Sequence, residues 1–233
     1  MLIEKIIKDL EFFSNEEYAK HHAGFFKTAK GEYGEGDLFL GLMVPDVRQV
    51  AKKYYLDVSL DELDELMKNP YHEVRLCALV MMVDKYKKVP TEEQAKFYDL
   101  YLRNVSYINN WDLVDISAPH VVGHYLFDKN SDKLFDLAQA QHLWSQRVSI
   151  IATLYFIRKQ RFEETLKLAE IFLTHRHDLM HKASGWMLRE VGKRDELALC
   201  GFLDKFHKVM PRTMLRYSIE KLSKEQKAYY MEK

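Results

Sequence analysis

The stretch Trp144-Ser-Gln-Arg-Val-Ser-Ile-Ile-Ala152 begins with aromatic and polar residues and continues with small and apolar residues at helical spacing. Four more segments repeat this pattern, and their starts lie roughly 30 to 40 residues apart, as in proteins built from stacked helix pairs. They are His72–Val80, Trp111–Pro119, His181–Arg189 and Pro211–Ile219. Further helical patterns precede such segments, for example at Thr91–Leu102 and Phe162–Phe172. The recurrence predicts an all-α chain, an α-solenoid of HEAT-like helical pairs.

In a solenoid of this kind the second helix of each pair lines a curved concave groove, so residues near the starts of these helices converge. No linker rich in Pro, Gly or Ser divides the chain, and we therefore expect one domain over residues 1–233. The three glycines within Lys30–Asp37 predict a loop at the rim of the groove, with Tyr33 at its tip. Pro45 and Asp46 within Gly41–Arg48 predict the first turn of a helix.

The composition is that of an ordinary globular protein. The chain has 233 residues, of which 47% are hydrophobic and 30% charged, with 9 Gly and 5 Pro, and this excludes disordered and collagen-like classes. Cys77 and Cys200 predict buried free thiols in a reducing compartment. Charges interrupt the apolar residues of Met1–Leu10, which predicts an amphipathic helix and argues against a signal peptide. With no long apolar run, we expect a cytoplasmic protein without a membrane partner.

Charge is balanced overall but unevenly distributed. The 35 Lys and Arg residues equal the 35 Asp and Glu residues, which does not favour a protein that coats nucleic acid by bulk charge. Acids outnumber bases between Tyr54 and Leu100, whereas bases outnumber acids from His177 to the end of the chain. Solvated helix faces explain this asymmetry as well as a nucleic-acid surface does.

Several classes of catalytic site lack support in the sequence. Gly31, Gly34 and Gly36 do not have the spacing of a phosphate-binding loop. The histidine pairs His120/His124 and His177/His181 share helical faces, but no third ligand accompanies either pair. No serine or cysteine stands in a nucleophile motif. We therefore expect neither a metal nor a cofactor.

One constellation combines aromatic rings, a carboxylate and cations. Trp111 and Asp115 are four residues apart and share one helical face, as do Lys182, Trp186 and Arg189. Arg147 follows Trp144 at the start of another repeat. These residues form a site if the solenoid brings them to one groove. The alternative interpretation is structural: the tryptophans are core residues, and the aspartate belongs to a structural salt bridge.

At these residues the chain resembles a known family. Asn110–Asp115, Leu143–Arg147 and His181–Glu190 resemble, in order and spacing, motifs of the AlkD family of DNA alkylation repair glycosylases. Gly41–Arg48 resembles the Gly-x-x-x-Pro-x-x-Arg signature of that family. The resemblance covers nearly the whole chain, and it implies HEAT-like helical pairs that hold duplex DNA in a basic concave cleft.

The resemblance also implies roles for single residues. Asp115 is the catalytic carboxylate, Trp111 and Trp186 face the cationic lesion and its sugar, and Arg147 holds the DNA backbone or the carboxylate. Phe25 contacts the substrate. The residues implied in DNA binding are Lys27, Lys182, Arg189, Lys193, Arg194, Arg212 and Arg216.

The function implied is that of a monofunctional DNA glycosylase, monomeric and free of metal and cofactor. It hydrolyses the N-glycosidic bond of N3- or N7-alkylated purines in duplex DNA, without a pocket for an extruded base. Two departures are visible: Phe25-Phe26-Lys27 stands where the family has Tyr-Met-Lys, and Gly31–Asp37 has no counterpart in its shorter members. The alternatives are a non-catalytic HEAT-repeat protein that binds distorted or branched DNA, and a protein-binding scaffold.

Overall fold

The computed structural model describes residues 1–232, and all regular elements in them are helices. Within these residues no β-strand forms, and the bridge between Leu38 and Tyr71 is isolated. The all-α prediction is therefore confirmed. The chain divides into two compact units, Met1–Ser117 and Ala118–Lys233. The expectation of one domain over residues 1–233 stays a prediction.

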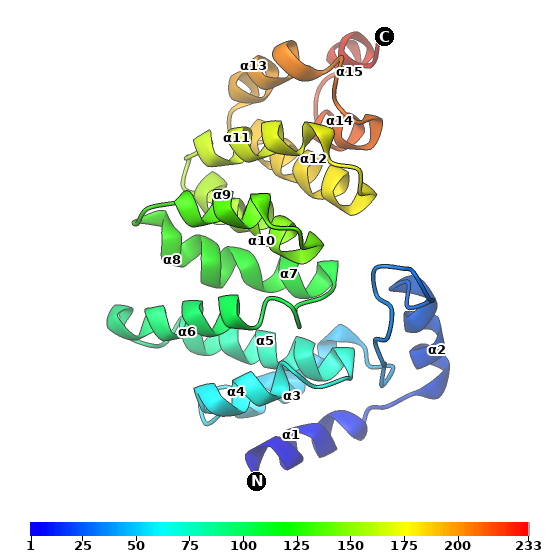
Figure 1. The fold of residues 1–233 in the computed structure, drawn as a ribbon, viewed down its shortest axis with the longest axis vertical. Helices are drawn as coiled ribbons and strands as arrows, with labels where there is room; N and C mark the ends of the chain where they lie inside the picture. Colours follow the sequence, from blue (N-terminus) through cyan, green and yellow to red (C-terminus); the bar gives the residue numbers. More distant parts are fainter. Residues whose placement is uncertain (233) are drawn as a thin grey trace. The chain divides into compact units, whose positions relative to one another are not determined.

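Helix α5 lies at the centre of the packing in the first unit, which has seven helices (Figure 1). They are α1 (Leu2–Glu11), α2 (Glu16–Phe25), α3 (Val44–Tyr54), α4 (Leu60–Leu66), α5 (His72–Tyr86), α6 (Thr91–Arg103) and α7 (Trp111–Ala118), whose last residue begins the second unit. Helix α5 contacts α1, α3, α4 and α6, and its residues from His72 to Val83 are all buried. Most of α5 lacks a polar face. A helix that is apolar on all sides is stable only in the interior, and this explains its central position.

Local signals in the sequence set the starts of these helices. Asn15 precedes α2, and its side chain accepts a hydrogen bond from the amide of Tyr18 at 3.0 Å. Ser59 precedes α4 and forms a reciprocal capping box with Glu62. Both arrangements satisfy amides that have no partner within the helix. Helix α3 carries Pro45 in its first turn, as the sequence predicts.

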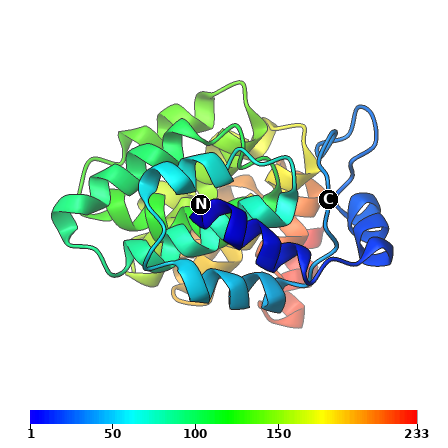
Figure 2. The ribbon, with the colours of Figure 1, turned by 90° about the horizontal axis from the view of Figure 1, so that it is seen from below.

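Helix α2 and the segment that follows it, residues 26–43, lie to one side of helices α3 to α6 (Figures 1 and 2). The buried carboxylate of Glu73 on α5 accepts hydrogen bonds from the amides of Leu40, Gly41 and Leu42 at 2.9, 2.8 and 3.2 Å. Gly41 has a positive φ of 82°, and a Cβ there would lie 2.0 Å from the carbonyl oxygen of Asn15. Glu73 therefore fastens this segment to α5 at a position that only glycine fits.

The second unit continues with a π-helical turn, η1 (Pro119–Gly123), and a short 3₁₀ turn, η2 (Phe172–Thr174). Its helices are α8 (His124–Phe127), α9 (Asp132–Gln139), α10 (Leu143–Arg158), α11 (Glu163–Ile171), α12 (Asp178–Gly192), α13 (Glu196–Phe206), α14 (Arg212–Ser218) and α15 (Lys224–Met231). Helix α10 contacts η1, α8, α9, α11 and α12, and α12 contacts α13 and α14. This packing of helices on their neighbours in sequence agrees with the predicted α-solenoid class.

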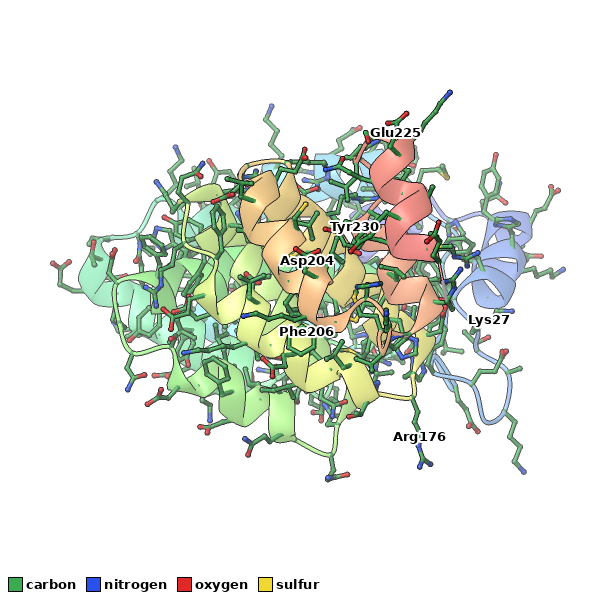
Figure 3. All side chains as sticks on the ribbon, turned by 90° about the horizontal axis from the view of Figure 1, so that it is seen from above. Lys27, Arg176, Asp204, Phe206, Glu225 and Tyr230 are labelled. Atoms are coloured by element: carbon green, nitrogen blue, oxygen red, sulfur yellow. The ribbon has the colours of Figure 1, made fainter. Side chains whose placement is uncertain are left out.

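Two contacts bring the last helices of the second unit together. Gly185 allows α12 to approach α14 closely, because a Cβ there would lie 2.5 Å from the carbonyl oxygen of Met214. Tyr230 of α15 lies beside Asp204 of α13 (Figure 3) and donates a hydrogen bond to its carboxylate at 2.9 Å. The ring of Tyr230 belongs to the apolar core of this region, together with Leu203.

The cysteine prediction is confirmed in part. Both thiols are free, and Cys77 is buried as expected, but Cys200 on α13 is only partly buried. Burial raises the pKa of Cys77 to about 12, so this thiol is unreactive. No helix among residues 1–232 is both long and apolar enough to cross a bilayer.

Replacing Gly41 by Ala is expected to lower the free energy of unfolding by about 2 to 4 kcal/mol, because the new side chain meets backbone and occupies a strained conformation. The matched control is Gly24→Ala in α2, since a Cβ at that position meets nothing within 4 Å. This control should leave stability unchanged or raise it slightly. Urea unfolding of both variants measures the difference, and equal stabilities would contradict the close approach at Gly41.

Candidate functional site

A buried network of charges joins three segments of the first unit. Arg75 on α5 donates to Asp37, which ends the glycine-containing loop, with 2.8 Å between Nη2 and Oδ1. The same aspartate oxygen accepts from the side-chain amide of Asn109, which lies just before α7, at 2.8 Å. Arg75 also donates to the carbonyl oxygens of Asn69 and Pro70 at 2.8 and 3.0 Å. The network therefore anchors the loop against α5 and against the approach to α7.

His72 stands at the centre of this network, only 1% exposed. Its Nε2 lies 2.8 Å from Asp112 Oδ2, and its Nδ1 lies 3.5 Å from Asp37 Oδ2. Burial by itself lowers the pKa of His72, but the charge and hydrogen bond of Asp112 outweigh burial and raise this pKa to about 9. Burial likewise opposes ionisation of Asp37, yet contact with His72 and the charge of Arg75 hold the pKa of Asp37 below its usual range. At neutral pH His72 is therefore an imidazolium between two carboxylates.

Five rings from four segments gather above this network, and we call Phe25, Phe26, Phe39, His72 and Trp111 the aromatic cluster. Phe26 stacks on Phe39 and on Trp111, with ring centroids 5.3 and 5.6 Å apart. It also lies 4.8 Å from the ring of His72. Phe25 meets Trp111 edge to face at 6.0 Å. The cluster therefore joins the end of α2, the following segment, α5 and α7.

A cavity of about 360 Å³ opens beside the cluster, and we call it the aromatic pocket. Its lining is mainly apolar and includes His21, His22, Phe25, Phe26, Phe39, Leu42, Met43, Val44, His72, Glu73, Leu76, Trp111 and Asp112. Ligand sites in proteins have this character, with apolar walls and a few polar groups. The resemblance implied no pocket for a base, so this cavity is a feature that sequence analysis did not anticipate.

A larger hollow of about 510 Å³ lies in the second unit. It is lined by Ala138, Gln146, Ile171, Phe172, Thr174, His175, Arg176 and His177, and Arg176 points away from the ribbon (Figure 3). None of the site residues predicted from the sequence lines it. Of the site residues predicted from the sequence, Phe25 and Trp111 line the smaller pocket of the first unit.

The structure brings together two of the site residues predicted in the first unit. Trp111 is the first residue of α7 and half-buried, and the exposed ring of Phe25 packs against it. Asp115 lies one turn further along α7 and is half-buried. Lys27 follows the end of α2, is exposed, and has a left-handed backbone with φ of 57°.

Two other predicted catalytic residues belong to the second unit. Arg147 on α10 is buried and donates from Nη1 to the carbonyl oxygen of Leu179 at 2.7 Å. Trp186 on α12 is half-buried. Their roles stay predictions.

Most of the predicted DNA-binding cations of the second unit are paired with carboxylates. Lys182 pairs with Asp178 at 2.8 Å, and Arg189 pairs with Glu220. Lys193 and Arg194 share Glu190 at 2.5 and 3.1 Å. On α14, Arg212 donates only to the carbonyl oxygen of Met231 at 3.2 Å, and Arg216 is exposed without an ion-pair partner among residues 1–232. Two cations of α14 are therefore the most available to an anion.

Sequence analysis assigned no role to several residues of this site, namely Phe26 and Phe39 in the aromatic cluster, and Asp37, His72, Arg75 and Asp112 in the network. One signal was present, because His72, Glu73 and Arg75 are ionisable residues at the start of a helix that is otherwise apolar. Buried charges require partners, so such a group predicts carboxylates and donors from elsewhere in the chain. The sequence does not identify which carboxylates and donors these are.

Neither histidine pair has a metal-binding arrangement. His181 directs Nε2 to the carbonyl oxygen of His175 at 2.5 Å, and the ring of His124 lies 4.9 Å from that of Tyr155. Across residues 1–232, no group of three or more His, Cys, Asp and Glu side chains is placed to hold a metal ion. The expectation of a metal-free protein stays a prediction.

The charge of His72 should make stability depend on pH. Because the pKa of about 9 in the folded protein exceeds the ordinary value of 6.5, this stabilisation is complete below about pH 6.5 and is lost as the pH rises through 9. From about pH 6 to about pH 10, the wild type should lose about 3 kcal/mol of unfolding free energy relative to His72→Gln. Urea unfolding across this range measures the difference, and parallel pH profiles would show that His72 is neutral.

Comparisons with known proteins bear on this site. A sequence model of the family described as DNA alkylation repair enzyme matches residues 6–222. A solved structure described as a predicted DNA alkylation repair enzyme from Enterococcus faecalis shares the fold, with a TM-score of 0.70 and 18% identity, covering 91% of this chain and 97% of its own. No curated protein sequence matches. Because the family match spans most of its length, the chain belongs to the DNA alkylation repair enzyme family, whose role implies DNA as a partner.

Proposed function

We propose that this protein is a monofunctional DNA glycosylase that excises cationic N3- or N7-alkylated purines from duplex DNA by hydrolysis of the N-glycosidic bond. It acts as a monomer and without a metal or cofactor. The observation that carries this proposal is the half-buried face of α7, where Trp111 meets Phe25 and Asp115 follows one turn later. Membership of the alkylation repair family supports it.

The chemistry of the lesion explains why a carboxylate suffices. Alkylation of a ring nitrogen makes the base a cation and a good leaving group, so its departure needs little or no general acid. The sugar left behind develops oxocarbenium character, as in glycoside hydrolysis. The Asp115 carboxylate stabilises that positive charge and orients the attacking water.

Aromatic rings supply discrimination between damaged and normal bases. A cation close to the face of an aromatic ring gains about 0.5 to 2 kcal/mol of binding free energy. A neutral base does not gain this contribution. In the first unit Trp111 and Phe25 offer such rings, and Phe25 lacks the hydroxyl that the family's tyrosine carries there. In the second unit we assign Trp186 the same role and Arg147 the role of holding the DNA backbone or the carboxylate.

Phosphate contacts account for DNA affinity, and exposed cations make them most readily. Lys27, Arg212 and Arg216 are exposed. Lys182, Arg189, Lys193 and Arg194 are held by carboxylates of the protein and must exchange these for phosphates on binding. This exchange reduces the binding free energy that these four cations gain from phosphates, so the cations of α14 should contribute more to DNA affinity.

Asp115→Asn is expected to retain DNA binding and to lose excision by about 100-fold or more, because the amide cannot stabilise the developing positive charge. The measurement is release of N7-methylguanine and N3-methyladenine from methylated duplex DNA. Asp99→Asn, at an exposed position of α6, is the matched control. Unchanged excision would refute the assignment. No release by either protein, with DNA binding intact, would instead favour the non-catalytic binder of distorted or branched DNA.

Arg216→Ala and Arg212→Ala are expected to weaken binding to all DNA sequences alike. Each lost phosphate contact should reduce the slope of log affinity against log salt by about 0.9. Arg194→Ala should have a smaller effect, because Glu190 already holds that guanidinium. Affinities measured by fluorescence anisotropy at several salt concentrations give the slopes. A loss limited to one DNA sequence would argue against phosphate contacts.

A further inference from the structure

The larger hollow of the second unit has no role in the proposed mechanism, and we call it the α12 hollow because it lies at the start of that helix. Its volume of about 510 Å³ is within the range of ligand sites. It has an apolar side and a polar side, formed by Ala138, Ile171 and Phe172 and by Gln146, Thr174, His175, Arg176 and His177. None of these lining residues carries a carboxylate. A hollow whose only fixed charge is positive attracts an anion.

Hydrogen bonds decide which polar atoms can donate to such an anion. The Nδ1 atom of His175 accepts from the backbone amide of His177 at 3.0 Å, so the proton of this ring lies on Nε2. That Nε2 atom lies 3.0 Å from Oε1 of Gln146 and therefore donates to it. The Gln146 oxygen is thus occupied. Its NH₂ group has no partner among residues 1–232 and remains available as a donor.

The two histidines shape the polar side without adding charge. Nδ1 of His177 accepts from the backbone amide of Leu179 at 3.2 Å, so the proton of this ring also lies on Nε2. Burial lowers the pKa of His177, and burial lowers the pKa of His175 as well. Both rings are therefore neutral at neutral pH, and the positive charge must come from another residue.

Arg176 supplies that charge. Its side chain is exposed, points away from the ribbon (Figure 3) and has no hydrogen-bond or ion-pair partner within residues 1–232. Thr174, two residues earlier, is also exposed, and its hydroxyl is unpaired in the same part of the chain. The nearby acid Asp178 is held by Lys182 at 2.8 Å and does not line the hollow. An anion that binds Arg176 therefore displaces no carboxylate, in contrast to one that binds a paired cation of α12.

The α12 hollow lies next to a predicted site residue. Arg147 directly follows Gln146 on α10, and its Nη1 donates to the carbonyl oxygen of Leu179 at 2.7 Å. Gln146 contacts His175, at the other end of the same connection. Two consecutive residues of α10 thus hold residues 175–179, three of which line the hollow. DNA bound at this end of α10 is therefore within reach of the hollow.

We propose that the α12 hollow binds a backbone phosphate of duplex DNA, with Arg176 as the cation and with Gln146 and Thr174 as neutral donors. This inference rests on the DNA binding in the proposed function and adds a subsite that none of the residues predicted from the sequence forms. Phosphate contacts position a protein on the duplex. The hollow is larger than a lone phosphate, so a phosphodiester fits it better, with its flanking sugar against Ile171 and Phe172.

Removal of the charge tests Arg176. Arg176→Ala should weaken binding of an undamaged duplex by about 10-fold and reduce the slope of log affinity against log salt by about 0.9, because one phosphate contact is lost. The matched control is Arg158→Ala, an exposed cation at the last position of α10 and about 18 Å from Gln146 along the helix. It should leave affinity and slope nearly unchanged. Fluorescence anisotropy at several salt concentrations measures both.

Removal of a neutral donor tests Thr174. Thr174→Val keeps the shape of the side chain and should weaken duplex binding by about 2- to 5-fold, because one uncharged hydrogen bond is lost. The salt slope should not change, since no charge is removed. Thr91→Val, at the exposed first position of α6, is the control. Equal affinities of these two variants would show that the Thr174 hydroxyl does not contact DNA.

Single neutral linkages in the DNA locate the phosphate. A methylphosphonate is placed at each position of the duplex in turn. At one position it should weaken binding of the wild type by about 10-fold and binding of Arg176→Ala hardly at all. Calorimetry with inorganic phosphate is the second arm. Phosphate binding that requires Arg176, combined with DNA affinity that does not, would assign the hollow to a free phosphate and overturn the DNA contact.

The outcomes distinguish the subsite from the glycosylase. Excision by the wild type, together with an Arg176→Ala variant that binds DNA like Arg158→Ala, would overturn the subsite and leave the glycosylase intact. A reduced salt slope in Arg176→Ala and one coupled methylphosphonate position, without any excision, would support the subsite in a protein that only binds DNA. The same reduced slope together with excision by the wild type would support both.

Discussion

The architecture of the first unit depends on the burial of His72 as a cation between Asp37 and Asp112. An isolated buried charge is prohibitively unfavourable, so each of these groups requires the others. The network draws Asp37, at the end of the glycine-containing loop, and Asp112, in the first turn of α7, onto α5. Glu73, the next residue after His72, binds the segment at Gly41 in the same way. Two adjacent residues of one helix thereby hold three separate parts of the chain.

This arrangement gives α7 two kinds of chemical surface. Trp111 and Asp112 belong to the pocket, while Asp115 lies one turn beyond it. An aromatic face attracts a cation that lies over it, whereas a carboxylate stabilises positive charge that develops in a transition state. In the proposed function, this spacing of one helical turn places the ring of Trp111 and the carboxylate of Asp115 on one face of the same short helix.

In the second unit, carboxylates pair with the cations of α12, whereas α14 carries Arg212 and Arg216 and no carboxylate. Exposed ion pairs contribute little to stability, so their main effect is to lower the net positive potential that DNA encounters. Because the charges of the chain balance overall, the proposed DNA binding rests on a few available cations, such as those of α14, rather than on a uniformly basic surface.

The helices could be predicted from the sequence, because apolar periodicity, caps and the first-turn Pro45 are local properties. The sequence also determined that Trp111 and Asp115 share a face, since four residues make about one turn. The pocket that Phe26, Phe39 and His72 enclose with Trp111 could not be predicted in this way, because these residues are far apart in the chain and meet only in the folded protein. Contact between these residues depends on the ion pairs that the buried charges form. Such ion pairs are a property of the folded interior and not of any local stretch of sequence.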